Sequence, residues 1–330
     1  MTNPKELPFA SVLEALFSDE QLPIHLLYRL SDLSEADFAQ FRRQWAGVDE
    51  DRRVALVRHM ADIAEDNYLI DFSPVFTYLF ADPAASVRAA ALDGVWDAES
   101  PQIIQPIIGM LQRDPDTGVR AAAARALAHY ILLAEWEQID SALSEPIVEA
   151  LLAEYDRPTT PPEVKRAALE SVSSAAHPRI AGLINDAYEE GSDDLQLSAI
   201  FAMGNTADES WLPILEHELG SPSADFRAEA ARACGMIGAP AAIEMLEQLL
   251  SDEELEVGLA AVYALGQIGG EQAFELLSRM ADDPDYEEYY DAIDEALEEM
   301  EWMDSAFDLL TFPSLEDEDD ADNDDDLRLN

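Results

Sequence analysis

Apolar residues recur along this chain at the spacing of one face of an α-helix, and the pattern is clearest between Phe226 and Gly270. Two consecutive segments there begin at Phe226 and Val257, and both carry mostly small or apolar residues at the same offsets. Offsets 3, 4, 7 and 8 hold Glu229, Ala230, Ala233 and Cys234 in the first segment, and Ala260, Ala261, Ala264 and Leu265 in the second. These offsets share one helix face, and their small side chains let a second helix approach closely.

Glycines follow this face in both segments, as Gly235 and Gly238 in the first and Gly266 and Gly269 in the second. Glycine adopts the left-handed backbone conformation that commonly ends a helix. We therefore expect the first helix of each segment to end at these glycines and a second helix to follow. Each segment is predicted to be a helix hairpin.

The residue that begins this helix recurs through most of the chain. It is found at Val87, Val119, Val164, Leu195, Phe226, Val257 and, with a weaker match, Tyr289. Between Val164 and Val257 the spacing is a constant 31 residues. Self-similarity at such a period is typical of a solenoid, in which each hairpin buries its apolar face against its neighbours.

The repeats resemble the HEAT-repeat family, in the short bacterial form that also occurs in phycobilin lyases. The resemblance rests on Val-Arg and Phe-Arg helix starts, the alanine runs after them and Asp-Pro turns, and it covers roughly Val48 to Met300. These positions are Val87-Arg88, Val119-Arg120, Phe226-Arg227, Asp82-Pro83 and Asp114-Pro115. The resemblance implies an all-α fold, a right-handed α-solenoid of HEAT-like hairpins with atypical capping helices. It also implies a structural ladder between repeats, formed by Asp82, Asp114 and Asp252 with Arg88, Arg120 and Arg227.

Departures from the repeat divide the chain into three regions. Residues 1–47 match the repeat poorly and are predicted to form an N-terminal helical cap, with helices near 9–17 and 24–30 and a helix start at Ser34. Residues 48–312 form the predicted solenoid, with a long insertion near 128–162 that either carries a binding function or only bends the superhelix. Residues 313–330 are predicted to be a disordered acidic tail, because nine of the twelve residues from Leu315 to Asp326 are acidic.

The formal net charge of −51 narrows the classes of partner. Phosphate backbones and anionic membrane surfaces are bound by Lys and Arg, so we expect neither nucleic acid nor membrane as a partner. The acidity favours solubility, and it is also compatible with a basic protein partner or with a salt-rich cytoplasm. No secretory signal or long apolar run is present, which favours a cytoplasmic location.

Motifs for catalysis, cofactor binding and metal binding were not found in the sequence. There is no Gly-rich phosphate loop, dinucleotide fingerprint, serine nucleophile elbow or histidine pair at helical spacing. Cys234 is the only cysteine and lies on the apolar helix face, so it is expected to be a core residue. We therefore expect no enzyme activity, no cofactor and no metal site.

A candidate binding surface follows from the family resemblance, which implies that the Val-opened helices line the concave side of the solenoid. Offsets 2, 6 and 9 of these helices point away from the buried face. Arginine and large apolar residues at these offsets are Trp96, Arg125, Arg166, Leu197, Phe201, Arg232, Leu259 and Tyr263. Arginine and aromatic residues are enriched at protein-binding hot spots, although Phe201 and Tyr263 could instead pack between repeats.

The sequence therefore favours a non-enzymatic scaffold that binds a protein partner, either basic or an extended peptide, through the concave face. Two alternatives stay open. One is a chromophore chaperone resembling the phycobilin lyases, and the other is a polyanionic chaperone or mimic that binds basic proteins.

Overall fold

The computed structural model describes residues 7–18, 20–67, 69–96, 98 and 100–310. This part of the chain is all-α and contains no β-strand. The α-helices are α1 (Phe9–Phe17), α2 (Glu35–Trp45), α3 (Glu50–Asp66), α4 (Ser73–Leu79), α5 (Ala85–Asp93), α6 (Ile104–Arg113), α7 (Thr117–Glu135), α8 (Ser144–Asp156), α9 (Pro162–Val172), α10 (Ile180–Glu190), α11 (Asp193–Asn205), α12 (Leu212–Glu218), α13 (Ala224–Ile237), α14 (Ile243–Leu249), α15 (Leu255–Ile268), α16 (Gly270–Ala281) and α17 (Tyr290–Leu310). Short 3₁₀ helices, named η, precede several of them: η2 (Ile24–Leu30), η3 (Pro101–Ile103), η4 (Ser141–Leu143), η5 (Glu209–Trp211), η6 (Pro240–Ala242) and η7 (Pro284–Tyr289).

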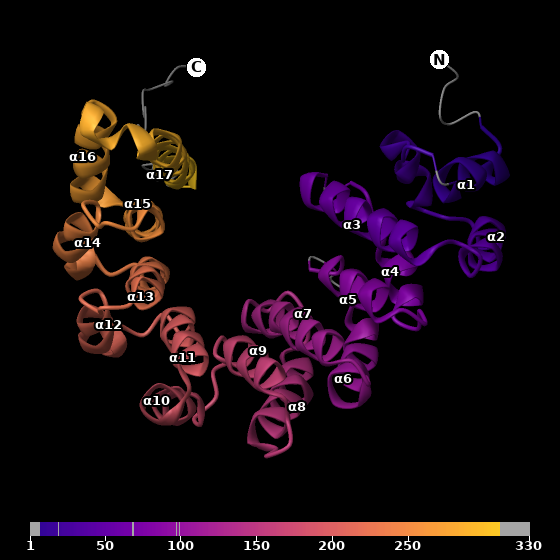
Figure 1. Cartoon of the computed structure of the whole chain (residues 1–330), viewed down its shortest axis with the longest axis horizontal. Helices are drawn as coiled ribbons and strands as arrows, with labels where there is room; N and C mark the ends of the chain where they lie inside the picture. The colour runs from indigo at the N-terminus through magenta and orange to yellow at the C-terminus, as the bar shows by residue number, and fades with distance from the viewer. Residues whose placement is uncertain (1–6, 19, 68, 97, 99, 311–330) are drawn as a thin grey trace, which may run out of the picture.

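The helices form an open arc with the two ends of the chain at its two tips (Figure 1). Odd-numbered helices from α3 to α17 lie along the inner side of the arc, and even-numbered helices from α4 to α16 lie along the outer side. The α-solenoid class expected from the repeats is confirmed. The Val-opened helices are the inner ones, so they line the concave side as expected.

The repeat positions coincide closely with the starts of the inner helices. Val87, Val119, Val164, Leu195, Phe226 and Val257 are each the third residue of their helix. Tyr289 departs from this rule because it ends η7, one residue before α17 begins. The regular register arises because the third residue is the first that points into the core, where the four valines are fully buried.

Glycines allow successive inner helices of the C-terminal half to approach closely. A Cβ added at Gly204 would lie 2.7 Å from the Ala233 Cα, one at Gly235 would lie 2.7 Å from the Ala264 Cα, and one at Gly266 would lie 2.9 Å from the Ala296 Cβ. Gly235 and Gly266 therefore do not end their helices as we expected. The ends are at Gly238, with φ of 69°, and Gly269, with φ of 64°, where a left-handed backbone favours glycine.

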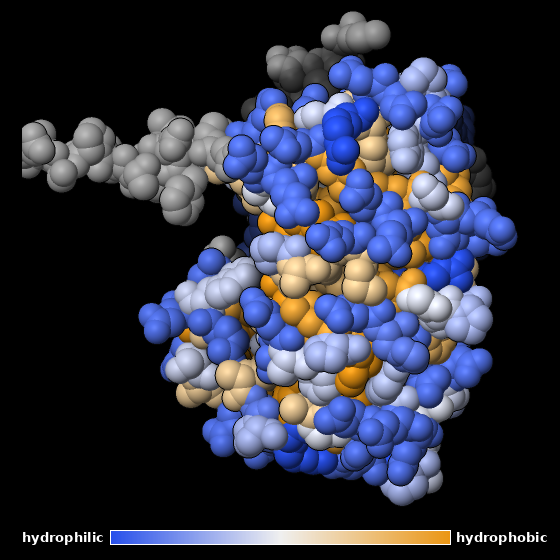
Figure 2. Space-filling model, turned by 90° about the vertical axis from the view of Figure 1, so that its left-hand side faces the viewer, coloured by the Kyte–Doolittle hydropathy of each residue, from blue (hydrophilic) through white to orange (hydrophobic). Residues whose placement is uncertain are grey.

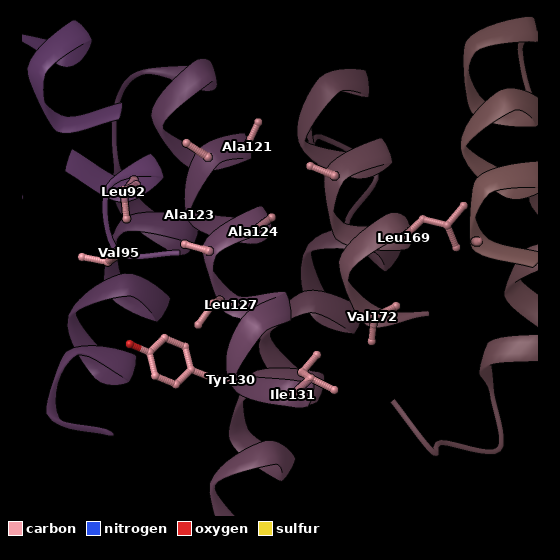
Figure 3. Close-up of a cluster of buried hydrophobic side chains, with 14 of the residues drawn as sticks. Leu92, Val95, Ala121, Ala123, Ala124, Leu127, Tyr130, Ile131, Leu169 and Val172 are labelled. Atoms are coloured by element: carbon pink, nitrogen blue, oxygen red, sulfur yellow. The ribbon is translucent and has the colours of Figure 1, made fainter. Parts of the chain in front are cut away.

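The core is continuous from one repeat to the next. In Figure 3, α7 lies between α5 and α9, with Tyr130 directed toward the α5 side and Ile131 toward α9. Both side chains are fully buried. Cys234 belongs to the same continuous core, and burial raises the pKa of its thiol to about 12, which agrees with its expected role as an inert core residue.

A ladder of Arg–carboxylate pairs is present, and it contains all six residues expected from the resemblance together with Arg53 and Glu154. Each arginine pairs with a carboxylate at or after the end of the following outer helix, in the pairs Arg53–Asp82, Arg88–Asp114, Arg120–Glu154 and Arg227–Asp252. Among the positions that follow the repeat-opening residues from Val87 to Val257, three lack this pair, and one of them is Gly258, which has no side chain. Lys165 instead lies 4.6 Å from the ring centroid of Tyr155, and Gln196 donates to the backbone carbonyl of Tyr188.

The insertion lengthens α7 to Glu135 and adds a proline-rich loop between α8 and α9. Within this segment Glu154 is fully buried and accepts hydrogen bonds from Arg120, Arg157 and Thr160. The ladder carboxylate is therefore supplied by the last turn of α8, and the loop residues Arg157 and Thr160 donate to it.

The N-terminal region contains the two helices expected at 9–17 and 24–30, followed by α2 with Ser34 as its N-cap. Trp45 of α2 is buried and donates from Nε1 to Asp82 at 2.8 Å, which connects this region to the first rung of the ladder. The predicted boundaries at residues 47 and 312 stay predictions, and the acidic tail lies outside the described residues. No helix in the described part of the chain is both long and apolar enough to cross a membrane.

Candidate partner-binding surface

The eight residues predicted for the binding surface all lie on inner helices or directly after one. Trp96 follows α5, Arg125 lies on α7 and Arg166 on α9. The remainder are Leu197 and Phe201 on α11, Arg232 on α13, and Leu259 and Tyr263 on α15. All eight are exposed or half-buried, so each is accessible from solvent.

Four of these residues come together in one hollow of about 350 Å³, which we call the central groove. Arg166, Leu197, Phe201 and Arg232 line it from α9, α11 and α13. The rest of the lining was not predicted and consists of Glu170, Ser198, Asp225, Ala228, Glu229 and Glu256. Four carboxylates and two guanidinium groups therefore surround the groove.

Both arginines of the central groove are already engaged with carboxylates. Arg232 contacts Glu229 at 3.2 Å and Glu256 at 2.9 Å. Arg166 lies 3.5 Å from the carboxylate of Asp194 and donates from Nε to the Ser198 hydroxyl at 3.2 Å. Since the arginines are paired, the groove does not present them as free cations.

The carboxylates of the groove are less well compensated. The Ser198 hydroxyl donates to Glu170 at 2.5 Å, which places this carboxylate toward α11. The pKa of Glu229 is raised, mainly by burial, although Arg232 lowers it, and the negative charges of Glu170 and Glu256 raise it further. The groove therefore holds negative charge that its own arginines do not fully neutralise.

A second hollow, the N-terminal pocket, lies on α3 and α5 and has a volume of about 550 Å³. Its polar lining includes Arg58, His59, Asp62, Glu65 and Asp93, and the 41% exposed indole of Trp96 forms one side. Burial raises the pKa of Asp93, while Arg125 and Arg58 act in the opposite direction. Arg125 thus interacts electrostatically with the N-terminal pocket, and it does not line the central groove.

The structure separates the remaining predicted residues from the central groove. Leu259 and Tyr263 lie on α15 outside its lining, and the Tyr263 hydroxyl accepts a hydrogen bond from Gln267 at 3.1 Å. Trp136, which is 63% exposed at the end of α7, was missed by the sequence analysis. It lies in the insertion, where the repeat register is lost, and it lines a further hollow together with Trp96.

The missed carboxylates carry a recognisable signal. Glu170 is at offset 6 of its helix, the offset that identified Arg125, Phe201, Arg232 and Tyr263, but only arginine and apolar residues were selected there. Ser198 and Glu229 are at offset 3, which was assigned to the buried face. Offset 3 lies at the margin of that face, so a polar residue there reaches the groove.

No cluster of three or more His, Cys, Asp or Glu residues suited to a metal ion occurs among the residues that the structure describes. The outer side of the C-terminal repeats is also largely polar at its surface (Figure 2). Figure 2 faces the outer helices of the C-terminal repeats and shows mostly hydrophilic residues, with hydrophobic residues visible in bands between them.

Solved structures with a similar arrangement have low identity to this chain. Human deoxyhypusine hydroxylase in complex with glycerol is 20% identical, with 91% of this chain and 97% of that chain covered and a TM-score of 0.34. The Escherichia coli protein YibA is 18% identical, with 86% and 98% covered and a TM-score of 0.46. An engineered protein is 18% identical, with 89% and 88% covered and a TM-score of 0.37. Similarities this distant give no basis for transferring an activity or a partner.

Curated protein sequences contain no match to this chain. A family model described as HEAT repeats matches residues 73–154, 179–256 and 212–298, which together make up more than half of the chain. The matched regions contain the ladder pairs Arg88–Asp114, Arg120–Glu154 and Arg227–Asp252 and most of the central groove. This protein belongs to the HEAT-repeat family.

Proposed function

We propose that this protein is a non-enzymatic scaffold that binds a protein partner through the concave face of its solenoid. The observation that carries the proposal is the central groove, where four successive inner helices contribute an aromatic ring, a leucine and paired charges to one hollow. A partner that lies along such a surface contacts several repeats at once.

The composition of the groove supports protein recognition rather than catalysis. Phe201 and Leu197 provide half-buried apolar area, and Arg232 and Arg166 provide planar donors that already order nearby carboxylates. Partly exposed aromatic and arginine side chains within a concave surface are the usual anchors of protein interfaces. A cytoplasmic location, expected from the sequence, stays a prediction.

The proposal can be tested with variants that change one aromatic residue on either side of the arc. Phe201→Ala removes the ring from the central groove, and Phe274→Ala removes a 38% exposed ring from the outer helix α16. Both proteins would be crosslinked in cell extract, and the captured proteins would be identified by mass spectrometry.

We expect a discrete partner that is captured by the wild type and by Phe274→Ala but is lost with Phe201→Ala. Capture that is unaffected by Phe201→Ala, or affected equally by both variants, would contradict binding through the concave face. Circular dichroism of each variant checks that the helices are intact.

A further inference from the structure

The two hollows of the concave face share one composition. The central groove combines the ring of Phe201 with Glu170, Glu229 and Glu256, and the N-terminal pocket combines the ring of Trp96 with Asp62, Glu65 and Asp93. In each hollow an aromatic ring lies among carboxylates that outnumber the cationic side chains. The same combination therefore occurs on α3–α5 and again on α9–α15.

The charges already present explain why a further cation would be stabilised in the central groove. Arg232 contacts both Glu229 and Glu256, so one guanidinium group is divided between two carboxylates. Glu170 accepts a hydrogen bond from a neutral donor, the Ser198 hydroxyl. The negative charge of Glu170 raises the pKa of Glu229. A positive group placed between Glu170 and Glu229 would reduce the repulsion between them.

The N-terminal pocket offers comparable conditions. Asp62 is 3.4 Å from Nδ1 of His59, a partner that carries charge only when it is protonated. Asp93 is exposed at the surface, and desolvation raises its pKa in spite of two nearby arginines. The carboxylates of this pocket therefore also lack full compensation.

Lys and Arg side chains match this composition better than any other protein side chain. Their aliphatic stems pack on apolar surface, and their charged ends bind carboxylates through strong hydrogen bonds. An aromatic ring beside the carboxylates adds a cation–π contact. An acidic or phosphorylated segment would meet unfavourable charge at the same positions, because the groove arginines are already paired.

We propose that the concave face binds an extended Lys- and Arg-bearing segment of the partner, with one cationic side chain between Glu170 and Glu229 and another beside Trp96 and Asp93. This inference rests on the proposed function and specifies the chemistry of the partner. The net acidity of the chain attracts a basic segment from a distance, and the two hollows select where its cationic side chains bind.

The test must separate these hollows from the overall negative charge. A fluorescein-labelled extended peptide of Lys, Arg and Ser would be titrated with the full chain, and binding would be followed by fluorescence anisotropy at moderate and high salt. Matched peptides of Glu and Ser, and of Gly and Ser, serve as probes of opposite and zero charge.

Two double variants remove the same charge from opposite sides of the arc. Glu170→Gln with Glu229→Gln changes the central groove, and Glu244→Gln with Glu271→Gln changes exposed residues of the outer helices α14 and α16. We expect the groove variant to bind the basic peptide about tenfold more weakly, as for loss of a charge-assisted hydrogen bond, and the outer variant to bind nearly as the wild type.

An equal loss in both double variants would overturn the inference, because overall charge would then explain binding. Preference for the acidic or neutral peptide would overturn it as well. Asp62→Asn with Glu65→Gln, which changes exposed residues of the N-terminal pocket, provides an independent variant should the groove variant lose its helical circular dichroism signal.

The outcome is distinguishable from that of the proposed function. If a partner is lost with Phe201→Ala but the basic peptide shows no preference for the groove, the scaffold function stands and the basic chemistry is wrong. If neither the partner nor the peptide depends on the groove, both proposals fail.

Discussion

Arginine–carboxylate pairs differ in geometry between two regions of this molecule, the ladder between repeats and the central groove. In the ladder, Arg88 donates two hydrogen bonds to Asp114 at 2.8 and 2.7 Å and a third to the backbone carbonyl of Asp82. These two side chains are 11% and 8% exposed. In the groove, Arg232 contacts Glu256 once at 2.9 Å, and their side chains are 37% and 75% exposed.

The same pair of residue types therefore occurs as a buried, bidentate contact in the ladder and as an exposed, single contact in the groove. A buried, bidentate pair that also holds a backbone carbonyl cannot be broken without leaving unpaired polar groups in the interior. An exposed pair contributes little to stability, because water can replace each partner. Only the exposed pairs are accessible to groups from outside the molecule.

The largest expected effect is on stability, in the Asp82→Ala variant. Asp82 is 6% exposed and accepts hydrogen bonds from Trp45 and Arg53, so its removal leaves a buried guanidinium without its partner. We expect a loss of about 3–5 kcal/mol in the free energy of unfolding. Urea denaturation followed by circular dichroism measures it, with Glu256→Ala as the groove counterpart. Similar losses in the two variants would remove the distinction between ladder and groove.

A smaller effect is expected when the charge is kept and the geometry is changed. Arg88→Lys keeps a cation beside Asp114 but cannot donate two parallel hydrogen bonds to its carboxylate. We expect a loss of about 1–2 kcal/mol, against a change within about 0.5 kcal/mol for Arg166→Lys in the groove. The comparison of the two midpoints in urea would contradict our interpretation if Arg166→Lys proved the more damaging.

The pH dependence of stability is expected to have opposite sign in the two regions. The pKa of Asp252 is lowered, chiefly by its hydrogen bond from Arg227, so its ionised form stabilises the fold. That contribution is fully present above the ordinary aspartate pKa of about 3.9 and is lost as the pH falls through the lowered value. The pKa of Glu229 is raised by burial, so ionised Glu229 costs stability near neutral pH, and this cost disappears as the pH falls through the raised value.

Thermal unfolding across pH would test these signs. Asp252→Asn should be less stable than the wild type near neutral pH, and the difference should shrink in acid. Glu229→Gln should unfold at a higher temperature than the wild type near neutral pH. This difference in melting temperature should shrink as the pH falls and the wild-type carboxyl becomes protonated. A loss of stability in both variants at neutral pH would mean that Glu229 is a structural residue like Asp252.

The smallest effect is expected for Arg232→Gln. Because Arg232 contacts Glu229 and Glu256 at the edge of the groove, its removal should change the free energy of unfolding by no more than about 0.5 kcal/mol. Differential scanning calorimetry of this variant beside Arg227→Gln compares two arginines of the same helix. A larger loss in Arg232→Gln would assign Arg232 to the ladder.

Much of the fold could be predicted because the repeat-opening residues recur at a regular spacing in the sequence. Each repeat-opening residue from Val87 to Val257 is the third residue of an inner helix. Local periodicity is sufficient to find these helices. The partner of each ladder arginine was harder to predict, because it depends on which carboxylate of the following outer helix lies within reach of the guanidinium group. Glu154 was missed because it lies in the insertion, and it has no Asp-Pro signature.

The candidate surface was predicted in outline, and its chemistry was not. The outward offsets selected Arg166, Phe201 and Arg232 on three helices, and the structure brings the three side chains together in one hollow. The contact between Arg232 and Glu229 has i,i+3 spacing within α13, but the pattern of one helix cannot show that Glu256 also contacts Arg232, because that contact joins α13 to α15. The outward offsets therefore selected the arginines of the groove without the carboxylates that contact them.

The Gly–Ala contacts between inner helices also bear on how such a chain can change in length. Gly204 with Ala233 and Gly235 with Ala264 form the same contact one period apart, so a hairpin's leading and trailing surfaces are complementary. A duplicated hairpin can accordingly join the stack without a new interface, and a deleted one leaves matching surfaces behind. Insertion of a single residue inside a helix would rotate every later contact off its partner. Duplications and deletions are thus accommodated when they add or remove whole repeats. The length of the arc can therefore change by one hairpin at a time.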